Sequence, residues 1–352
     1  MTVANPVRYA VIGCGSVGPV HADAARKLEN VELVAVCDVI PERARGAAER
    51  FDAAAYTNCE ALLEAEAPEA VSICTPHHTH AELTVTCLRR GAHVLCEKPL
   101  ALSHEDMDRM VETAAAEGRL LGGVFQHRFD PVAAAVKRAT EQGLFGQALN
   151  AGAYIRCYRG EDYYASGDWR GTWAGEGGAV LINQAIHSID VMHWLAGPVK
   201  SVFGRHTNLQ LGDAIEAEDT ACAFLEFESG AIGTIEATSS SHMDFAAGVH
   251  FYGTHGSLRL NTGGTDELEF LEMADPGERE RFERMIEAEA REESETVGKH
   301  CYGVSHRRQI ADFAEAVRTG GRPLVTGEDA RHAVEIVLAV YESAEQGRAV
   351  DL

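Results

Sequence analysis

The stretch "VRYAVIGCGSVG", Val7 to Gly18, decides the fold of the first part of this 352-residue chain. A short β-rich run leads into a glycine-rich turn, and the residues that follow, to about Glu29, have the composition of a helix. "VELVAVCD" then predicts a second buried strand, which ends in Asp38. A strand, a glycine turn, a helix and an acidic residue about 20 positions further on are typical of a dinucleotide-binding βαβ unit.

Each glycine of this turn has a separate role in such a unit. Gly13 permits the tight turn, Gly15 lets the backbone approach a pyrophosphate, and Gly18 allows close packing of helix on strand. N–H groups at the helix start favour phosphates. Asp38 accepts hydrogen bonds from both adenosine ribose hydroxyls and repels a 2′-phosphate, so NAD is expected rather than NADP; a ligand-free glycine turn is the alternative. The expected contacts here are Gly13, Gly15, Ser16, Val17, Gly18 and Asp38.

Strands and helices continue to alternate to about residue 126, which predicts a parallel sheet with its ligands at the carboxyl ends of the strands. Two loops fall at such ends: "TPHHTH", residues 75–80, and "EKP", residues 97–99. Lys98, in a chain poor in lysine, is expected beside the nicotinamide; a surface lysine that caps a turn is the alternative. The sequence leaves open whether the Lys98–Pro99 bond is cis. The expected cofactor contacts of this region are Thr75, Pro76, His77, His80, Glu97, Lys98 and Gln126.

Composition excludes several classes of function. The net charge of −23 argues against nucleic acid or an anionic membrane as partner. No long apolar run and no signal peptide are present, and the nine cysteines are scattered without a CxxC pair, so we expect reduced thiols and a cytoplasmic location. The loop histidines have no carboxylate or cysteine placed to complete a metal site, so no metal is expected.

The second half contains "LINQAIHSID", Leu181 to Asp190, in which Asn183, His187 and Asp190 fall at i, i+4 and i+7. On a regular helix these three polar side chains share one face. The β-rich runs that follow are separated by turn signals such as "ESG" and "GTHG", which predict an antiparallel sheet. We therefore expect an NAD-binding domain over 1–126 and a substrate-binding and oligomerisation domain over 127–352, whose last helices are able to pack back on the first domain.

The chain resembles the Gfo/Idh/MocA oxidoreductase family, which includes glucose–fructose oxidoreductase and inositol dehydrogenase. The match is carried by "GCGSVGPVHA", "CTPHHTHAEL", "GAHVLCEKPLA", "HRFDP", "SGDWRGTW", "GGAVLINQAIHSIDVMHWLAGPV" and "HRRQIADFAEAVRTGGRPLVTGEDARHAVEIV", which span the chain almost from end to end. This resemblance implies an α/β fold: a doubly wound Rossmann domain, then an α/β domain with a large, mostly antiparallel open sheet that holds the substrate. It also implies a homodimer or homotetramer.

The resemblance further implies roles for individual residues. Lys98 orients a substrate hydroxyl, and His187 takes its proton as hydride leaves for NAD. Many relatives have Asp four residues before that histidine; this chain has Asn183, which is expected to position the substrate or the imidazole ring. Trp169 and Arg170 are expected to reach the cofactor.

Polar and aromatic residues of the second half complete the expected substrate site, although the tryptophans alternatively anchor their loop and His306 alternatively serves structure. The leading hypothesis is an NAD-dependent dehydrogenase of a sugar, cyclitol or sugar derivative. Two alternatives stay open: an NAD-dependent glycosidase that oxidises, eliminates and re-reduces, and a non-catalytic NAD-binding regulator. The expected substrate contacts are Lys98, Arg128, Tyr154, Arg156, Trp173, Asn183, His187 and His306.

Overall fold

The computed structural model describes residues 6–243, 245–263, 267–291 and 303–352. The chain divides into two compact units, one formed by Met1–Gln126 with Tyr302–Arg331 and the other by His127–Cys301 with His332–Leu352. Helix α10 (Val304–Thr319) therefore belongs to the first unit although it comes late in the chain. The reason is hydrophobic burial, because Ile310 and Phe313 of α10 lie in the same apolar core as Tyr9.

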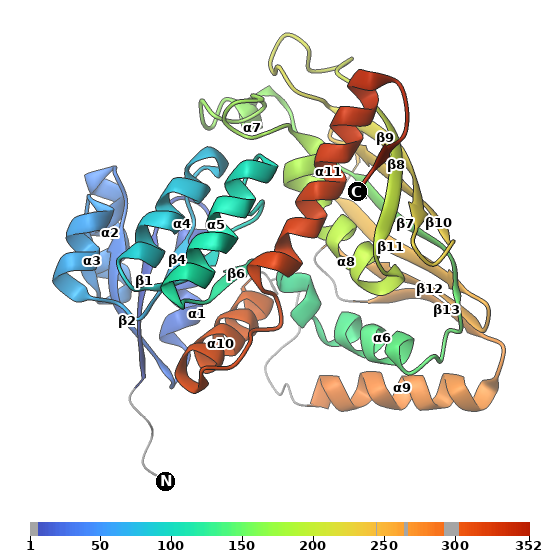
Figure 1. Ribbon diagram of the computed structural model, residues 1–352, viewed down its shortest axis with the longest axis horizontal. Coiled ribbons are helices and arrows are strands. Elements are labelled where there is room, and N and C mark those ends of the chain that lie inside the picture. The colour runs from blue at the N-terminus through green and yellow to red at the C-terminus, as the bar shows by residue number, and fades with distance from the viewer. Residues whose placement is uncertain (1–5, 244, 264–266, 292–302) are drawn as a thin grey trace. The chain divides into compact units, whose positions relative to one another are not determined.

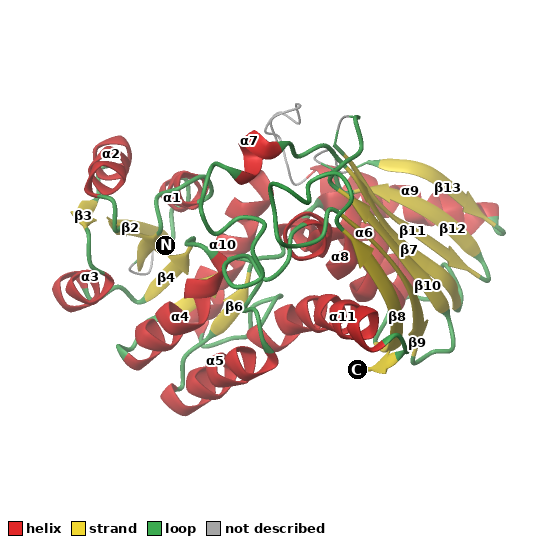
Figure 2. Ribbon diagram, turned by 90° about the horizontal axis from the view of Figure 1, so that it is seen from above, coloured by secondary structure: helices red, strands yellow, loops and turns green. Residues whose placement is uncertain are grey.

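The first unit is a doubly wound α/β domain. Its six strands lie in the order β3-β2-β1-β4-β5-β6 and all run parallel. Figure 2 shows α1, α2 and α10 on one face of this sheet and α3, α4 and α5 on the other. The strands are β1 (Val7–Ile12), β2 (Val31–Cys37), β3 (Ala54–Tyr56), β4 (Ala70–Ile73), β5 (His93–Cys96) and β6 (Leu121–Gly123), and the helices are α1 (Gly18–Arg26), α2 (Pro41–Phe51), α3 (Cys59–Glu66), α4 (His80–Arg89) and α5 (His104–Glu117).

Local sequence explains where these elements begin. The side chain of Asn58 accepts a hydrogen bond from Ala61 N at the start of α3, and that of Ser103 accepts one from Asp106 N at the start of α5. The inner strands β1, β4 and β5 of the parallel sheet are almost wholly buried, since helices cover both faces, and β4 has no exposed residue.

The second unit is built on an eight-stranded sheet with the order β13-β12-β11-β7-β10-β9-β8-β14. β7 and β10 pair in parallel, and every other pairing of this sheet is antiparallel. The strands are β7 (Ala148–Arg156), β8 (Val199–Thr207), β9 (Thr220–Phe227), β10 (Ile232–Thr238), β11 (Ala246–Gly253), β12 (Gly256–Asn261), β13 (Leu268–Met273) and β14 (Val350–Asp351).

Helices cover one face of this sheet, as Figures 1 and 2 show for α6, α8 and α11. Burial alternates along β9, where Leu225 and Phe227 are buried and Phe224 is exposed, so the opposite face is open to solvent in this chain. The helices of this unit are α6 (Pro131–Glu141), the short α7 (Glu161–Tyr164), α8 (Ile186–Ala196), α9 (Pro276–Arg291) and α11 (Gly327–Gln346), the first residues of which belong to the first unit.

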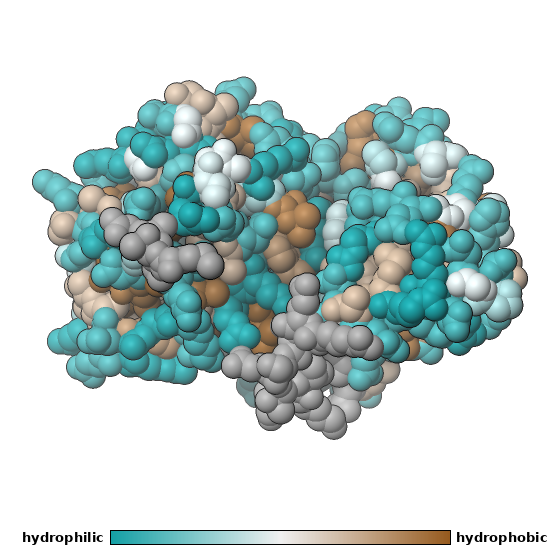
Figure 3. Space-filling view, turned by 90° about the horizontal axis from the view of Figure 1, so that it is seen from below, coloured by the Kyte–Doolittle hydropathy of each residue, from teal (hydrophilic) through white to brown (hydrophobic). Residues whose placement is uncertain are grey.

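The surface matches the acidic composition. The face drawn in Figure 3 is mostly hydrophilic, as a net charge of −23 implies. None of the helices in the described part of the chain is both long and apolar enough to cross a membrane. The eight cysteines for which the structure describes a thiol are all free.

Candidate active site

The glycine-rich turn after β1 has the geometry of a phosphate-binding turn. Gly13 has a φ of +97°, and a Cβ at this position would lie 2.4 Å from the carbonyl oxygen of Cys74. A Cβ at Gly18 would lie 1.8 Å from Gly13 O, whereas one at Gly15 would meet nothing within 4 Å. The chain itself therefore requires two of the glycines, and the third leaves open space at the start of α1, where a pyrophosphate fits.

Asp38 lies at the carboxyl end of the neighbouring strand β2. Its Oδ2 accepts a hydrogen bond from Cys14 N at 2.8 Å, and its Oδ1 accepts one from Ile40 N at 2.9 Å. The carboxylate is thus fixed next to the glycine turn. Gln126 is also buried, and its Oε1 receives no hydrogen bond from any residue that the structure describes. The open space, the fixed carboxylate and this buried acceptor all fit a bound dinucleotide.

The loop 75–80 and the EKP segment are joined by His80. Its Nδ1 lies 2.8 Å from Pro99 O and its Nε2 lies 2.9 Å from Thr75 O. Burial lowers the pKa of His80. Because both ring nitrogens lie within hydrogen-bond distance of backbone carbonyls, His80 links these two loops. The Lys98–Pro99 peptide bond is cis.

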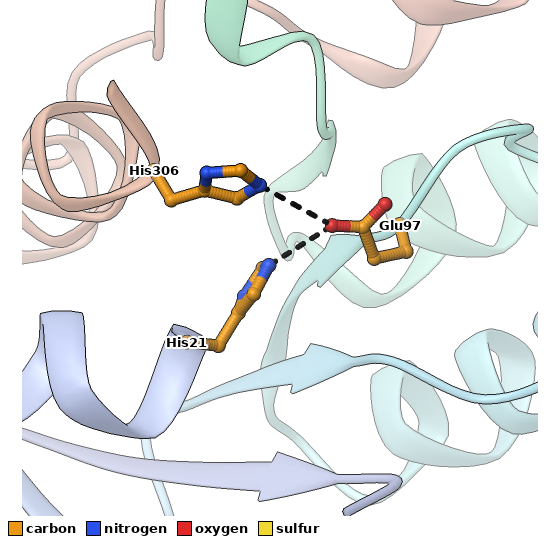
Figure 4. Close-up of side chains that lie close together, drawn as sticks. All are labelled: His21, Glu97 and His306. Carbon is orange, nitrogen blue, oxygen red and sulfur yellow. Dashed lines mark hydrogen bonds and ion pairs between the residues drawn. The ribbon is translucent and has the colours of Figure 1, made fainter. Parts of the chain in front are cut away.

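Glu97 lies in a buried cluster with two histidines, shown in Figure 4. Glu97 Oε1 lies 3.0 Å from His21 Nε2 and 4.0 Å from His306 Nε2. The other oxygen of Glu97 accepts the N–H of Lys98 at 3.1 Å. Burial alone would raise the pKa of Glu97, but the hydrogen bond from His21 and the electrostatic interactions with His21, His306 and Lys98 lower it to about 2. The cluster therefore fixes the backbone at Lys98.

These three side chains are also of the types that bind transition metals, and their ligand atoms lie within 4.8 Å of one another. Tetrahedral zinc brings neighbouring ligand atoms to about 3.3 Å. His21 already has contacts at both nitrogens, because its Nδ1 lies 2.8 Å from Ser72 Oγ. We interpret the cluster as a hydrogen-bonded carboxylate between two imidazoles. His306, expected to contact substrate, is buried within this cluster of the first unit.

The segment with the polar residues of the second unit is not a regular α-helix. Residues Val180–Ala185 form a π-helical turn that leads into α8. Asp190 is fully buried, and both its oxygens are bonded by Arg128, from Nε at 2.8 Å and from Nη2 at 2.6 Å. Asp190 therefore binds Arg128 in the core, whereas Asn183 and His187 are only partly buried. Arg128 forms this buried ion pair with Asp190, and the substrate contact expected of it stays a prediction.

Asn183 and His187 lie at the part of this segment that is only partly buried. The Nδ2 of Asn183 donates to Tyr163 Oη at 3.2 Å and to Glu176 Oε1. The His187 ring meets the ring of His127 edge to face, with centroids 5.3 Å apart, and His127 Nδ1 lies 2.5 Å from Asp130 Oδ2. The ring of His187 is thus packed against that of His127.

Sequence reasoning missed two buried carboxylates that hold this segment. Glu218 accepts hydrogen bonds from the backbone N–H groups of Ala179 and Leu181, at 3.0 and 2.9 Å, and from the hydroxyl of Tyr341 at 2.9 Å. Glu176 binds Asn183. The only local signal was a glutamate between glycines in "AGEGGAV"; Glu218 is far from the helix in sequence.

Comparison with known proteins decides the family. A sequence model of the oxidoreductase family with an NAD-binding Rossmann fold matches residues 7–124, and a model of that family's C-terminal α/β domain matches residues 137–352. The chain belongs to the Gfo/Idh/MocA family. The resemblance, the fold class and NAD as the cofactor of this fold are thereby confirmed.

Relatives within the Gfo/Idh/MocA family match along nearly the whole chain. Myo-inositol 2-dehydrogenase of Thermotoga maritima is 28% identical over 98% of this chain and 98% of its own length. The NAD⁺-dependent scyllo-inositol 2-dehydrogenase of Bacillus subtilis is 28% identical over 99% of this chain and 97% of its own. Among solved structures, the WlbA dehydrogenase of Bordetella pertussis, in complex with NADH and UDP-GlcNAcA, has a TM-score of 0.89 at 27% identity, with 99% and 98% of the two chains covered.

Two other predicted substrate residues of this family member lie away from α8. Tyr154 and Arg156 point to the helix-free face of the sheet, because Ala153 and Ile155 between them point into the core. The Tyr154 hydroxyl lies 3.1 Å from Thr234 Oγ1. Arg156 pairs with Glu236 at 2.6 Å. The structure therefore does not bring these two residues together with His187, which lies on the other side of the sheet.

The tryptophans of the loop before the π-helical turn have partners within the second unit. Trp173 is 40% exposed and packs edge to face on Tyr341, with centroids 5.1 Å apart. The Arg170 guanidinium lies over the Trp169 ring at 4.6 Å and donates to Tyr163 Oη at 2.8 Å. Trp173 is thus anchored and still exposes part of its ring. The cofactor contacts expected of Trp169 and Arg170 stay predictions.

We predict that Glu218→Gln flattens the pH dependence of stability between pH 5 and pH 8. Burial raises the pKa of Glu218 to about 7, although the N–H groups of Leu181 and Ala179 and the Tyr341 hydroxyl act in the opposite direction. A raised carboxyl pKa stabilises the fold below about pH 4.5, and this contribution is lost as the pH rises through 7. Between pH 5 and pH 8, the free energy of unfolding of the wild type should fall by about 2–3 kcal/mol more than that of the variant.

Urea titrations at the two pH values measure this difference, followed by tryptophan fluorescence, because all three tryptophans belong to the second unit. The introduced glutamine offers one acceptor fewer to the Ala179 N–H, so the variant is expected to be less stable at both pH values. The prediction concerns only the change in the free energy of unfolding between the two pH values, and an equal change in the two proteins would contradict it.

Proposed function

We propose that this protein is an NAD-dependent dehydrogenase that oxidises a secondary hydroxyl group of a sugar, a cyclitol or a sugar derivative. Three features support this reading: the dinucleotide turn, the EKP lysine, and a second unit in which Asn183 and His187 are held by buried carboxylates and packing. The last of these carries the proposal, because a regulator that only binds NAD has no need of a proton acceptor held in this way. The inositol dehydrogenases and the sugar-nucleotide complex among its relatives fit the same substrate class.

In this proposal each side chain has one task. His187 accepts the hydroxyl proton, since imidazole is the side chain best suited to that exchange near neutral pH. Lys98 donates a hydrogen bond to the substrate oxygen and stabilises the negative charge that develops there. Asn183 positions the substrate. NAD, held by the glycine turn and Asp38, supplies the hydride acceptor.

A screen for NAD reduction tests the proposal. Myo-inositol, scyllo-inositol, aldoses, uronates, UDP-linked sugars and aryl glycosides are each incubated with NAD or NADP, and absorbance at 340 nm is followed together with aglycone release. Reduction of NAD by at least one polyol, with little reduction of NADP, is expected. Aglycone release without net NADH would indicate the redox-assisted glycosidase, and NAD binding without any turnover would indicate the regulator.

We also propose that the protein forms a homodimer or homotetramer through the helix-free face of its large sheet. Four large apolar side chains on that face are each more than 40% exposed, and two of them, Phe203 and Phe224, lie opposite each other on β8 and β9. Light scattering coupled to gel filtration should report two or four times the 38.0 kDa chain mass, and a mass of one chain at micromolar concentration would contradict this. The four residues are Phe203, Phe224, Ile232 and Phe270.

We propose a cytoplasmic location because the described thiols are free. All eight cysteines whose thiols are described are free, and four of them are buried in the first unit. Free thiols persist in a reducing compartment, whereas secreted proteins commonly pair them.

A further inference from the structure

Glu176 is a fully buried carboxylate in the loop before the π-helical turn. Its Oε2 accepts the N–H of Gly171 at 2.5 Å, its Oε1 accepts the side-chain amide of Asn183, and the guanidinium of Arg170 lies 3.9 Å from the same Oε1. A buried charge is costly unless it is hydrogen-bonded and paired. These three contacts offset the cost, and they come from this loop and from Asn183.

The hydroxyl of Tyr163 is the second anchor of Asn183. It accepts hydrogen bonds from Asn183 Nδ2 at 3.2 Å, from Gln184 Nε2 at 3.0 Å and from Arg170 Nη1 at 2.8 Å. The Tyr163 ring also lies near two guanidinium groups, those of Arg159 at 5.2 Å and Arg170 at 4.6 Å. Tyr163 is therefore held in place independently of Asn183.

These two contacts determine which way the Asn183 amide faces. An ionised carboxylate only accepts hydrogen bonds, so the atom that faces Glu176 has to be the NH₂ group and not the carbonyl oxygen. The NH₂ group has two N–H bonds; one donates a hydrogen bond to Glu176 and the other donates to Tyr163. The amide is consequently oriented with Oδ1, a hydrogen-bond acceptor, on its other side.

We propose that Glu176 is a positioning residue of the dehydrogenase: it fixes Asn183 as a hydrogen-bond acceptor toward a hydroxyl group of the substrate. The inference rests on the proposed function. Asn183 would touch the substrate, and Glu176 acts only through Asn183. A substrate hydroxyl donates to Asn183 Oδ1, so the site favours a polyol over an analogue that lacks that hydroxyl.

The proposal makes a distinctive prediction for Glu176→Gln. The introduced glutamine keeps the Gly171 hydrogen bond through its oxygen and turns its NH₂ toward position 183, where it meets the NH₂ of Asn183. Two donors repel, so the Asn183 amide rotates and presents a donor to the substrate. Glu176→Gln should therefore lower kcat/KM by about 100-fold, as expected for a misplaced substrate, with a small change in melting temperature.

Moving the carboxylate to position 183 should reverse the loss. In the double variant Glu176→Gln/Asn183→Asp, the NH₂ of the introduced glutamine donates to the introduced aspartate, which again presents an acceptor to the substrate. Asn183→Asp alone places two carboxylates in contact and should lower both activity and stability. The double variant is expected to exceed both single variants in kcat/KM by at least tenfold. Glu161→Gln, at the exposed first residue of α7, is the matched control and should keep the wild-type rate.

The four variants are assayed with myo-inositol, or with whichever compound of the screen is oxidised fastest. Hydrogen exchange of the Asn183 side-chain amide is a readout that needs no substrate. The amide signal is assigned by its absence in Asn183→Asp, and its exchange should be slow in the wild type and fast in Glu176→Gln. A merely structural Glu176 would give rates that follow the melting temperatures, with no rescue in the double variant. Slow amide exchange and a wild-type kcat/KM in Glu176→Gln would overturn the proposal for Glu176 and leave the dehydrogenase function intact. The dehydrogenase function is tested separately: it would be contradicted if His187→Ala kept full turnover.

Discussion

Replacing His187 with alanine is expected to lower kcat by about 10³-fold, within the range of 10²–10⁴ that a positioned general base contributes. Without the imidazole, the substrate hydroxyl has to lose its proton to water while hydride leaves, and water is both weaker as a base and not held in place. NAD binding should persist, because the glycine turn and Asp38 belong to the other unit. Steady-state NADH formation and a fluorescence titration with NAD measure the two quantities.

His193→Ala is the matched control, since it removes an imidazole from the same helix α8. The Nδ1 of His193 lies 3.1 Å from Gly197 O near the end of the helix, and burial lowers the pKa of His193 to about 4, so the ring is neutral at the assay pH. This variant should keep kcat and lose only some stability. If His187→Ala and His193→Ala had the same kcat, His187 would not be the base.

The first unit could be predicted closely because its signals are local. The glycine turn, the acid at the end of β2 and the alternation of strands and helices each depend on residues close in sequence, and the structure places them as the spacing requires. The glycine geometry shows why: the positions of Gly13 and Gly18 exclude any side chain. The unit to which helix α10 belongs was harder to predict, because an apolar helix face does not indicate which of the two cores buries it.

The second unit was harder to predict, since its site depends on pairing between distant residues. The alternation along β7 shows that Tyr154 and Arg156 share a face, but not which face meets α8. The partner of the Arg128 guanidinium, Asp190, lies 62 residues later in the chain, so the ion pair could not be predicted from local sequence. The π-helical turn also has no clear sequence signature, and it shifts Asn183 out of the regular spacing with Asp190.

The partner of Asn183 could not be predicted either, although it lies only seven residues away. Many relatives are expected to have a carboxylate at position 183; here the carboxylate of Glu176 accepts a hydrogen bond from the Asn183 amide. The sequence shows the asparagine but not its partner. Glu97 and His306 behave in the same way: they lie more than 200 positions apart in the sequence yet meet in one buried cluster.

The second large effect is expected at Lys98. Methionine has a similar length and no charge, so Lys98→Met removes the ammonium and leaves the packing of the side chain largely in place. The negative charge that develops on the substrate oxygen then loses its stabilising partner, and kcat/KM should fall by about 10²–10³-fold. NAD titration checks that the cofactor site still forms, as the hydrogen bond between Glu97 and the Lys98 backbone is retained.

Lys27→Met is the control for this substitution, because the Lys27 side chain is 56% exposed and pairs with Asp23 on the surface of α1. Equal kcat/KM in Lys98→Met and Lys27→Met would exclude a role for Lys98 in the reaction. The double variant Lys98→Met/His187→Ala tests whether the two residues, one in each unit, act on the same hydroxyl. Residues that serve one proton transfer are strongly non-additive, so the double variant should be little slower than the slower single variant; multiplied losses would mean that Lys98 and His187 act on separate steps.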